Sequence, residues 1–222
     1  MAPFCYPEPV TESRFSGAKV ADDESPGKAA DARPKRERIL RAATKVFARK
    51  GFYATKVSEV AKAAGVADGT IYLYFKNKDD LLVSLFEDRI DRLLSTLAQE
   101  LAARPSPEAR LRCVIEMQLG LLEGQRDLAE VITVNLRQST KLMKQYAAPK
   151  FALYLDLIAQ VVSDGQKAGV FQESVSPHVM ARAIFGALDG VTMTWALGRA
   201  DAGGLSRAAT QIADVLLRGL LR

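Results

Sequence analysis

Histidine, cysteine and tryptophan are scarce in this sequence, whose 222 residues include one histidine, two cysteines and one tryptophan. Metal sites and disulfide frameworks need several cysteines or histidines at short spacings, and neither Cys5 nor Cys113 has such a neighbour. The sequence therefore predicts no metal site, no redox pair and no cofactor. The lone His178 follows Ser176-Pro177 at an expected helix start and is interpreted as a surface residue, which leaves acid–base catalysis little to use.

Long apolar runs and strand-like patterns are absent as well. No segment reaches the roughly 18 uninterrupted apolar residues of a membrane-spanning helix, and the opening MAPFCYPEPV lacks the basic-then-apolar order of a signal peptide. We expect a soluble cytoplasmic protein without a membrane partner. Alternating β-branched runs are also missing, whereas apolar residues from Pro34 onward recur with a helical period. The pattern predicts an all-α fold.

Positive charge is concentrated in one short part of the chain. Residues 34–80 hold eleven lysines and arginines against five acids, whereas residues 81–222 hold sixteen against fifteen. Residues 1–33 are slightly acidic and rich in Pro, Gly, Ser and Ala, so we expect a disordered arm there because this composition buries little apolar surface. The basic segment indicates a polyanionic partner.

Three short helices are expected in residues 34–80. The first opens at Pro34 and ends at Gly51, and the second is capped by Thr55. The third spans Asp68 to Phe75. These helices form a small head.

A larger helical body follows in residues 81–222. Asn77 is expected to cap a long fourth helix, and a stretch over 139–168 is expected to be kinked or divided by Pro149 and ended by Gly169. Further start signals are Ser106-Pro107, Asp127, Ser176-Pro177 and Ser206. About nine helices are expected in all.

Residues 55–75 have the dimensions of a helix-turn-helix. The turn Gly65-Val66-Ala67 separates two short helices, as in the motif whose second helix enters the major groove of DNA. Ile71 and Phe75 supply an apolar face that docks on the head, and the rest of the third helix points elsewhere. A purely structural helix pair is the alternative, but the positive charge in the same segment favours DNA binding.

The segment GFYATKVSEVAKAAGVADGTIYLYFKNKDDLL closely resembles the DNA-binding domain of the TetR/AcrR family of one-component transcriptional regulators. The match runs from Arg33 to Asp80 and includes the core G-V-x-x-G-T-I-Y-x-Y-F-x-x-K. The resemblance implies a TetR-like fold, a double-stranded DNA operator and control by a small-molecule effector.

The resemblance also implies which residues contact DNA. Thr55 and Lys78 match positions that clamp phosphates, Tyr72 and Tyr74 match positions that also reach the backbone, and the first residues of the third helix match positions nearest the base edges. Phosphate contacts fix the register on DNA, whereas groove contacts read its sequence. The full set is Thr55, Lys56, Asp68, Gly69, Thr70, Tyr72, Tyr74 and Lys78.

One position departs from the family's pattern. Ala67 and Asp68 stand where many members have a Ser-Lys pair, so the usual capping serine and a basic groove residue are both missing. Asp68 either caps the third helix or accepts a hydrogen bond from a cytosine amino group. We favour the cap, because phosphates would repel an unpaired carboxylate. The basic face of the first helix also stays open between a solvated surface and phosphate contact.

Broad apolar stripes lie on the last two expected helices. Either stripe could be ordinary intrachain core. However, a two-fold operator needs a two-fold protein, and TetR-like chains dimerise by packing their last two long helices against the partner's pair. The resemblance therefore implies a homodimer formed through these helices.

The body also resembles one branch of the family, through NLRQS and ARAIFGALDGVTMTW: the acyl-CoA-responsive, FadR-type regulators of fatty-acid degradation. The implied effector is a long-chain acyl-CoA whose binding weakens DNA affinity. Such a ligand needs an apolar channel and cations for its phosphates. Arg137 and Asp189 are polar residues within apolar stretches, and each is either a pocket group or part of a structural pair. The expected ligand-binding residues are Leu119, Val134, Arg137, Lys141, Leu155, Phe185, Leu188, Asp189 and Trp195.

The sequence thus predicts a homodimeric repressor that occupies a palindromic operator and leaves it when acyl-CoA binds, with the fourth helix as the lever between head and body. Three alternatives remain: a multidrug or other small-molecule sensor of the same family, a ligand-independent DNA-binding protein, and an acyl-CoA-handling enzyme. The sequence shows no set of residues with the types and spacing of a catalytic site, which argues against the enzyme. The pocket candidates include few acids and few aromatics, which argues against the drug sensor.

Overall fold

Helices make up every regular element of the computed structural model, which describes residues 26–138, 148–198 and 204–221. The only β-type pairing in these ranges is a single antiparallel bridge between Phe171 and Leu221. The elements are α1 (Pro26–Lys50), α2 (Val57–Ala64), α3 (Asp68–Tyr72), α4 (Lys78–Ala102), α5 (Pro107–Gly120), α6 (Arg126–Glu130), the π-helical turn η1 (Val131–Asn135), the 3-10 turn η2 (Leu136–Gln138), α8 (Ala148–Lys167), α9 (Pro177–Leu197) and α10 (Gly204–Leu220). The all-α prediction is confirmed.

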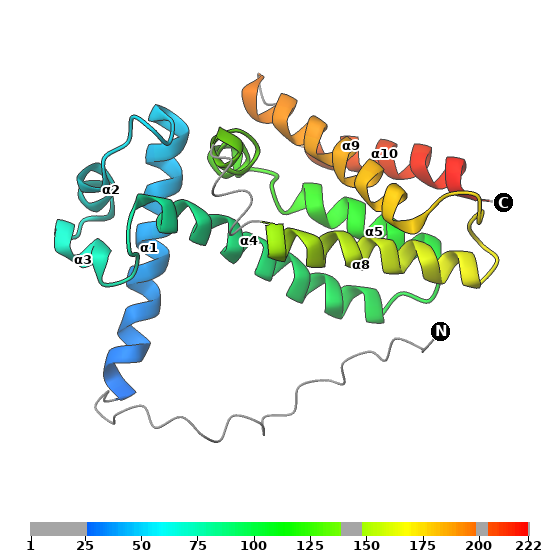
Figure 1. The fold of residues 1–222 in the computed structure, drawn as a ribbon, viewed down its shortest axis with the longest axis horizontal. Helices are drawn as coiled ribbons and strands as arrows, with labels where there is room; N and C mark the ends of the chain where they lie inside the picture. The colour runs from blue at the N-terminus through cyan, green and yellow to red at the C-terminus, as the bar shows by residue number, and fades with distance from the viewer. Residues whose placement is uncertain (1–25, 139–147, 199–203, 222) are drawn as a thin grey trace. The chain divides into compact units, whose positions relative to one another are not determined.

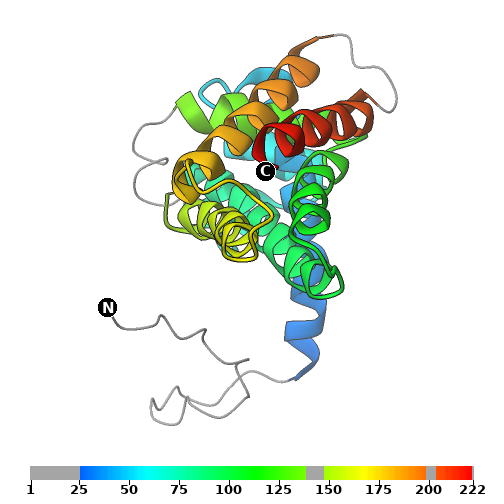
Figure 2. The ribbon, with the colours of Figure 1, turned by 90° about the vertical axis from the view of Figure 1, so that its right-hand side faces the viewer.

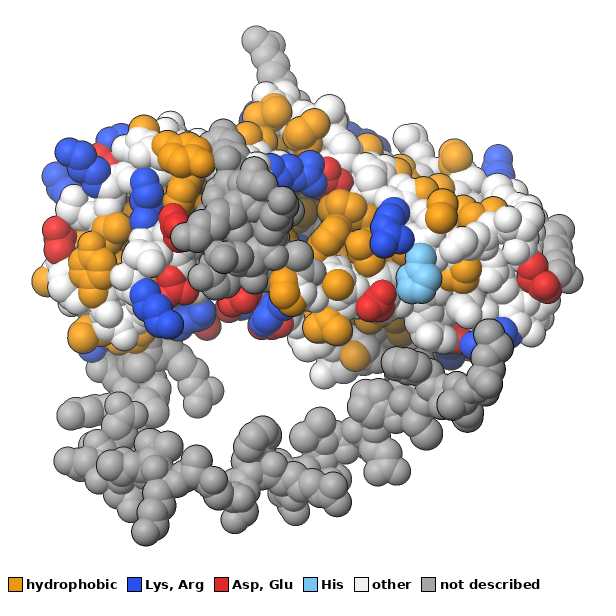
Figure 3. Space-filling view, in the orientation of Figure 1, with side chains coloured by type: hydrophobic (Ala, Val, Ile, Leu, Met, Phe, Trp, Pro, Cys, Tyr) orange, Lys and Arg blue, Asp and Glu red, His pale blue; other side chains and the backbone are white. Residues whose placement is uncertain are grey.

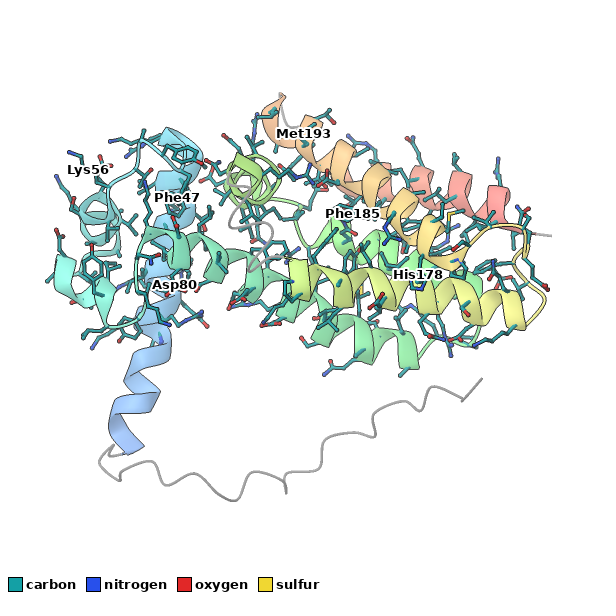
Figure 4. All side chains as sticks on the ribbon, in the orientation of Figure 1. Phe47, Lys56, Asp80, His178, Phe185 and Met193 are labelled. Atoms are coloured by element: carbon teal, nitrogen blue, oxygen red, sulfur yellow. The ribbon has the colours of Figure 1, made fainter. Side chains whose placement is uncertain are left out.

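The head has a hydrophobic core of its own. Figure 1 shows α2 and α3 beside α1 and the start of α4, apart from α5, α8, α9 and α10. The apolar face of α1 packs there with Val60, Ile71 and Phe75 and with the first two turns of α4. Phe47 points from α1 into this core, fully shielded from solvent (Figure 4). The predicted docking role of Ile71 and Phe75 is confirmed, because each is 1% exposed.

The body is a bundle of α4, α5, α8, α9 and α10 around a second core. Helix α5 packs against α10 and α8, and α9 packs against α8 and α10. Figure 2 shows these helices enclosing a common interior, with α9 and α10 side by side. Helix α4 belongs to both cores, since its first turns lie in the head while Leu93 and Leu97 lie in the body. None of the described helices combines the length and apolar character needed to cross a bilayer.

Several helix ends follow the local signals. The Asn77 side chain accepts a hydrogen bond from the Asp80 N–H (2.8 Å), and the Ser106 hydroxyl accepts one from the Ala109 N–H (3.2 Å), so both predicted caps are confirmed. Gly169 has φ +71° just after α8, the left-handed conformation that ends a helix without strain only at glycine.

Other predicted ends were wrong. Helix α1 begins at Pro26 and not at Pro34, so residues 26–33 of the expected disordered arm are helical. The alanines before Pro34 favour a helix, although Pro34 inside the helix removes one backbone hydrogen bond. Pro149 lies in the first turn of α8, where its missing N–H costs no hydrogen bond, so it does not kink that helix. Residues 139–147 of the predicted stretch lie outside the described residues.

Three more boundaries also differ from the prediction. Helix α10 begins at Gly204, so Ser206 lies inside it. Gln125, not Asp127, is the N-cap of α6, and Asp127 lies in the first turn, where the helix dipole favours its charge. Helix α3 ends at Tyr72, and the chain closes it with a hydrogen bond from the Phe75 N–H to the Ile71 carbonyl (3.0 Å).

Candidate nucleic-acid interface and ligand cavity

A glycine turn sets the angle between α2 and α3. Gly65 has φ +64°, where a side chain would strain the backbone, and its N–H donates to the Lys62 carbonyl (3.2 Å). The next N–H, that of Val66, donates to the Ala61 carbonyl (3.0 Å). These bonds satisfy the last carbonyls of α2 and hold α3 against the head.

The outer side of α3 is open to solvent. A Cβ built on Gly69 would meet no atom within 4 Å, and 57% of the Tyr72 surface is exposed. Asp68 is also exposed and Thr70 is half-buried. Tyr74, in contrast, is half-buried against the head core. The positions expected to read bases therefore lie on the surface, where a duplex can reach them.

The start of α2 differs from the prediction at Thr55. Its side chain is 2% exposed and its hydroxyl donates to the Gly51 carbonyl (2.8 Å), so Thr55 closes the preceding loop and does not cap α2. The N-cap is Lys56, whose N–H donates to the Glu59 carboxylate (3.0 Å). The hydrogen bond from the Lys50 ammonium, and then that from Lys56, lowers the pKa of Glu59. Figure 4 shows Lys56 at the outer edge of the head.

The Lys78 ammonium binds backbone carbonyls of the loop before α2. Its Nζ donates to the carbonyls of Phe52 (2.9 Å), Tyr53 (3.2 Å) and Thr55 (3.0 Å), and it lies 4.6 Å from the centroid of the Phe52 ring. Lys78 thus joins the start of α4 to the start of α2. This structural role was missed from the sequence, because Lys78 is 23 to 26 positions away from these loop residues and meets them only after folding.

Asp68 does not cap α3, contrary to the favoured prediction. The N-cap is Ala67, which has no side-chain acceptor, and Asp68 is the first helical residue. Its carboxylate is near the positive end of the helix dipole. The exposed carboxylate is consistent with the other alternative, an acceptor for a base amino group.

The body encloses a mostly apolar cavity of about 130 Å³. Helices α4, α5, α8 and α9 and the turns η1 and η2 contribute to its wall. Phe185 on α9 faces α8, where its ring lies 4.6 Å from that of Phe151 (Figure 4). The wall consists of Phe86, Arg89, Ile90, Leu93, Gln118, Leu122, Ile132, Thr133, Leu136, Arg137, Phe151, Tyr154, Phe185, Asp189 and Thr192.

Two polar pairs lie in this wall. The buried Tyr154 hydroxyl donates to the Gln118 side chain, and burial raises the pKa of Tyr154, which keeps the phenol neutral. The Arg137 guanidinium donates to the Asp189 carboxylate (2.6 Å) and so links η2 to α9. Arg137 and Asp189 are therefore both a pocket group and a pair, which the sequence had left as alternatives.

The turns η1 and η2 contact both cores. Ile132 and Thr133 line the cavity, whereas Val131 packs in the core of the head. Asn135 is 2% exposed, and its side-chain oxygen accepts a hydrogen bond from the Phe52 N–H (2.8 Å). A single short segment thus connects the cavity wall to the loop that precedes α2. Isolated π-helical turns of this kind often occur at functional sites.

Two family models match this chain in succession. Residues 39–85 match the bacterial regulatory proteins of the tetR family, and residues 86–219 match the C-terminal region of YsiA-like proteins. The chain belongs to the TetR family of bacterial transcriptional regulators.

Several relatives of this TetR family regulator are named for fatty-acid metabolism. The chain is 35% identical over 165 residues to the fatty acid metabolism regulator protein of Bacillus subtilis, which covers 74% of this chain and 85% of that protein. The structure of FadR from Bacillus subtilis in complex with stearoyl-CoA matches with 32% identity and a TM-score of 0.76, over 82% of this chain and 98% of that one. FadR from Bacillus halodurans, a fatty acid degradation regulator, matches with 33% identity and a TM-score of 0.80, over 85% and 98%.

The predicted ligand residues of this TetR family body separate into two groups. Arg137, Phe185 and Asp189 line the cavity. Leu119 and Leu188 are fully buried in the body's core and do not line it. Val134, Leu155 and Trp195 are not part of the wall either, and Lys141 lies outside the described residues.

Most of the wall was missed from the sequence. The aromatic pair Phe151 and Tyr154, three residues apart on one face of a helix, was a usable signal, as was Gln118 within an apolar stretch. Arg89 carried no such signal, because it lies among other charged residues.

Proposed function

We propose that this regulator is a repressor that binds a palindromic operator as a homodimer, leaves it when a long-chain acyl-CoA binds, and controls genes of fatty-acid degradation. The observation that carries the proposal is the position of residues 131–137, which belong to the cavity wall and to the core of the DNA-binding head. The stearoyl-CoA complex of the related FadR supports the effector class.

The DNA contacts follow from the exposed side of α3. Gly69 and Thr70 approach base edges, and Tyr72 and Lys56 contact the backbone on either side. Tyr74 and Lys78 reach phosphates only at the edge of the interface, since both are half-buried. We assign Thr55 a positioning role, because its hydroxyl proton is already donated to Gly51.

A homodimer is supported by unpaired apolar side chains on the last two helices. Val179 and Leu197 of α9 are 60% and 58% exposed, and Val215 of α10 is 70% exposed. Figure 3 shows further apolar side chains around His178, the single histidine, along the α8–α9 side. Exposed apolar patches of this kind are characteristic of protein–protein interfaces.

The small cavity volume supports a conformational response. Ligand sites usually measure roughly 300–1,000 Å³, so a long acyl chain must widen a cavity of about 130 Å³. The ligand therefore prefers a conformation with displaced wall residues, and η1 transmits that displacement to the head through Val131 and Asn135. Such differential affinity for two conformations is what couples effector binding to DNA release.

The charge of the cavity wall favours an anionic ligand over a cationic drug. Among the described residues of the wall, the charged side chains are Arg89, Arg137 and Asp189, and the Asp189 carboxylate is already paired with Arg137. A cation would have to displace that arginine, whereas an anion meets a net positive wall.

Selection of operator sites from random duplex DNA, repeated with stearoyl-CoA, CoA alone and the cation ethidium, tests the proposal. We expect a palindromic site whose affinity falls roughly 5- to 150-fold with stearoyl-CoA and is unchanged by CoA or ethidium. Operator affinity that no acyl-CoA alters would make the chain a ligand-independent DNA binder. A response to ethidium alone would make it a drug sensor, and release of free CoA from the thioester would indicate an enzyme.

A further inference from the structure

Arg89 of α4 lies where the apolar cavity meets a charged surface groove. It lines the cavity and also an open groove of about 950 Å³ between α1, α4 and the connection from α5 to α6. We call this second hollow the basic groove, because its lining holds six cationic side chains against three carboxylates. The cations are Arg38, Arg41, Lys45, Arg89, Arg92 and Arg126, and the acids are Glu37, Asp88 and Asp127.

Among the described residues, no partner balances the charge of Arg89. Within the described part of the chain, no hydrogen bond or ion pair reaches its guanidinium, although the side chain is half-buried. The adjacent Asp88 pairs with Arg36 (3.7 Å) and Arg92 (3.0 Å), and Asp189 in the cavity wall pairs with Arg137. Burial first, and then the like charge of Arg92, lowers the pKa of Arg89 to about 10.

A half-buried, unpaired guanidinium is unfavourable in the free protein, and an anion bound beside it removes that cost. We propose that Arg89 binds the anionic group of the effector, so that the acyl chain occupies the cavity and the charged end leaves through the basic groove. The inference rests on the acyl effector proposed above and adds the orientation of the ligand and its charged contact.

This orientation brings the ligand against the head directly. Helix α1 of the head contributes Arg38, Arg41 and Lys45 to the groove. Arg38 and Lys45 form no ion pair with any described residue, whereas Arg41 pairs weakly with Glu37 (3.9 Å). An effector that spans cavity and groove therefore contacts α1 as well as the body.

The chemistry of the bound group is an oxyanion, which a free fatty acid supplies as a carboxylate and an acyl-CoA supplies as phosphates. Calorimetric titration of the full chain with palmitate, with palmitoyl-CoA and with the uncharged palmitoyl thioester of N-acetylcysteamine separates these sources. The variant is Arg89→Met, which removes the guanidinium and keeps an unbranched apolar stem. The control is Arg182→Met, which removes an equal charge from exposed surface on α9.

We expect Arg89→Met to weaken palmitoyl-CoA binding roughly 10- to 100-fold and to leave the neutral thioester unchanged, while Arg182→Met changes neither. A matching loss for palmitate assigns Arg89 to a carboxylate, and a loss restricted to palmitoyl-CoA assigns it to phosphate. The melting temperature of Arg89→Met should equal or exceed that of the parent, because no stabilising pair is lost.

The inference is overturned if Arg89→Met binds palmitoyl-CoA as the parent chain does, or if it loses the neutral thioester equally and melts lower, as a structural residue would. Either result leaves the acyl effector itself standing. If the parent chain binds none of the three ligands, the proposed effector fails first and the role of Arg89 fails with it.

Discussion

Lys78 illustrates how one side chain can serve both fold and binding surface. Its ammonium carries three protons, and three loop carbonyls accept them in the free protein. The same charge stands at the start of α4, at the edge of the proposed DNA interface. Because the loop contacts use all three protons, Lys78 acts on a nearby phosphate through its fixed positive charge and not through a hydrogen bond.

Lys78→Ala should therefore reduce both stability and DNA affinity. Loss of its hydrogen bonds should lower the free energy of unfolding by about 1–3 kcal/mol, measured by urea denaturation. Loss of its positive charge beside the DNA phosphates should flatten the plot of log affinity against log salt by about one unit. Lys76→Ala is the matched control, since Lys76 is exposed and close in sequence. Equal stability of the two variants would contradict the structural role.

Gly69→Ala should separate binding from folding. The added methyl group meets open space in the free protein, so the melting temperature should stay the same or rise, because alanine favours helices. On DNA the methyl group should disturb a close groove approach and weaken operator binding by about 1–3 kcal/mol. Gly120→Ala, also facing open space, is the control. If fluorescence anisotropy gives both variants parental affinity, this side of α3 does not face the duplex.

At the scale of elements, the turn η1 is the point where the cavity wall and the core of the head meet. Its π-helical geometry places Val131 and Asn135 toward the head and Ile132 and Thr133 toward the cavity. Helix α4, the lever expected from the sequence, also spans both cores. The two elements together provide two parallel connections between cavity and head.

Asn135→Ala should weaken the coupling carried by η1. The Phe52 N–H would lose its buried acceptor, at about 1–3 kcal/mol of stability. Stearoyl-CoA should then lower operator affinity by a smaller factor than in the parent chain. This corresponds to a coupling free energy that is smaller by about 0.5–2 kcal/mol. Anisotropy titrations with and without stearoyl-CoA measure it.

The control for this variant is Val46→Ala, which destabilises the same core of the head without touching Asn135. If Val46→Ala reduces the coupling as much, lost stability explains the effect. If neither variant changes it, α4 carries the coupling alone.

At the scale of the whole molecule, the oligomeric state determines how many operator half-sites the protein can bind at once. A palindromic site presents two half-sites one helical turn apart, and a single head of this size contacts one of them. The apolar residues exposed on α9 and α10 provide a surface through which two chains would pair their heads.

Val215→Lys should convert the proposed dimer to a monomer. The position is 70% exposed, so a single chain tolerates lysine, whereas a two-fold interface would bury two like charges. Light scattering coupled to gel filtration should show half the parental mass, with operator affinity reduced. Ala102→Lys at the end of α4, an exposed position on another helix, is the control and should stay dimeric. A dimeric Val215→Lys would place the interface elsewhere.

Short-range patterns predicted much of this protein. The helical period, the caps at Asn77 and Ser106 and the glycine turn at Gly65 depend on residues within a few positions of each other, so they are readable before folding. The docking face of Ile71 and Phe75 follows from the same periodicity. The sequence also determined the charge of the head, and the motif within it identified the family.

Tertiary structure alone decided the cavity and its connection to the head. The Arg137–Asp189 pair joins residues 52 positions apart, and the bond from Phe52 to Asn135 joins residues 83 apart. Arg89 has no ion-pair partner among the described residues, and this likewise depends on which carboxylates the other helices place near it. Such contacts result from the packing of whole helices, and a local sequence pattern carries no information about that packing because the partners meet only once the chain has folded.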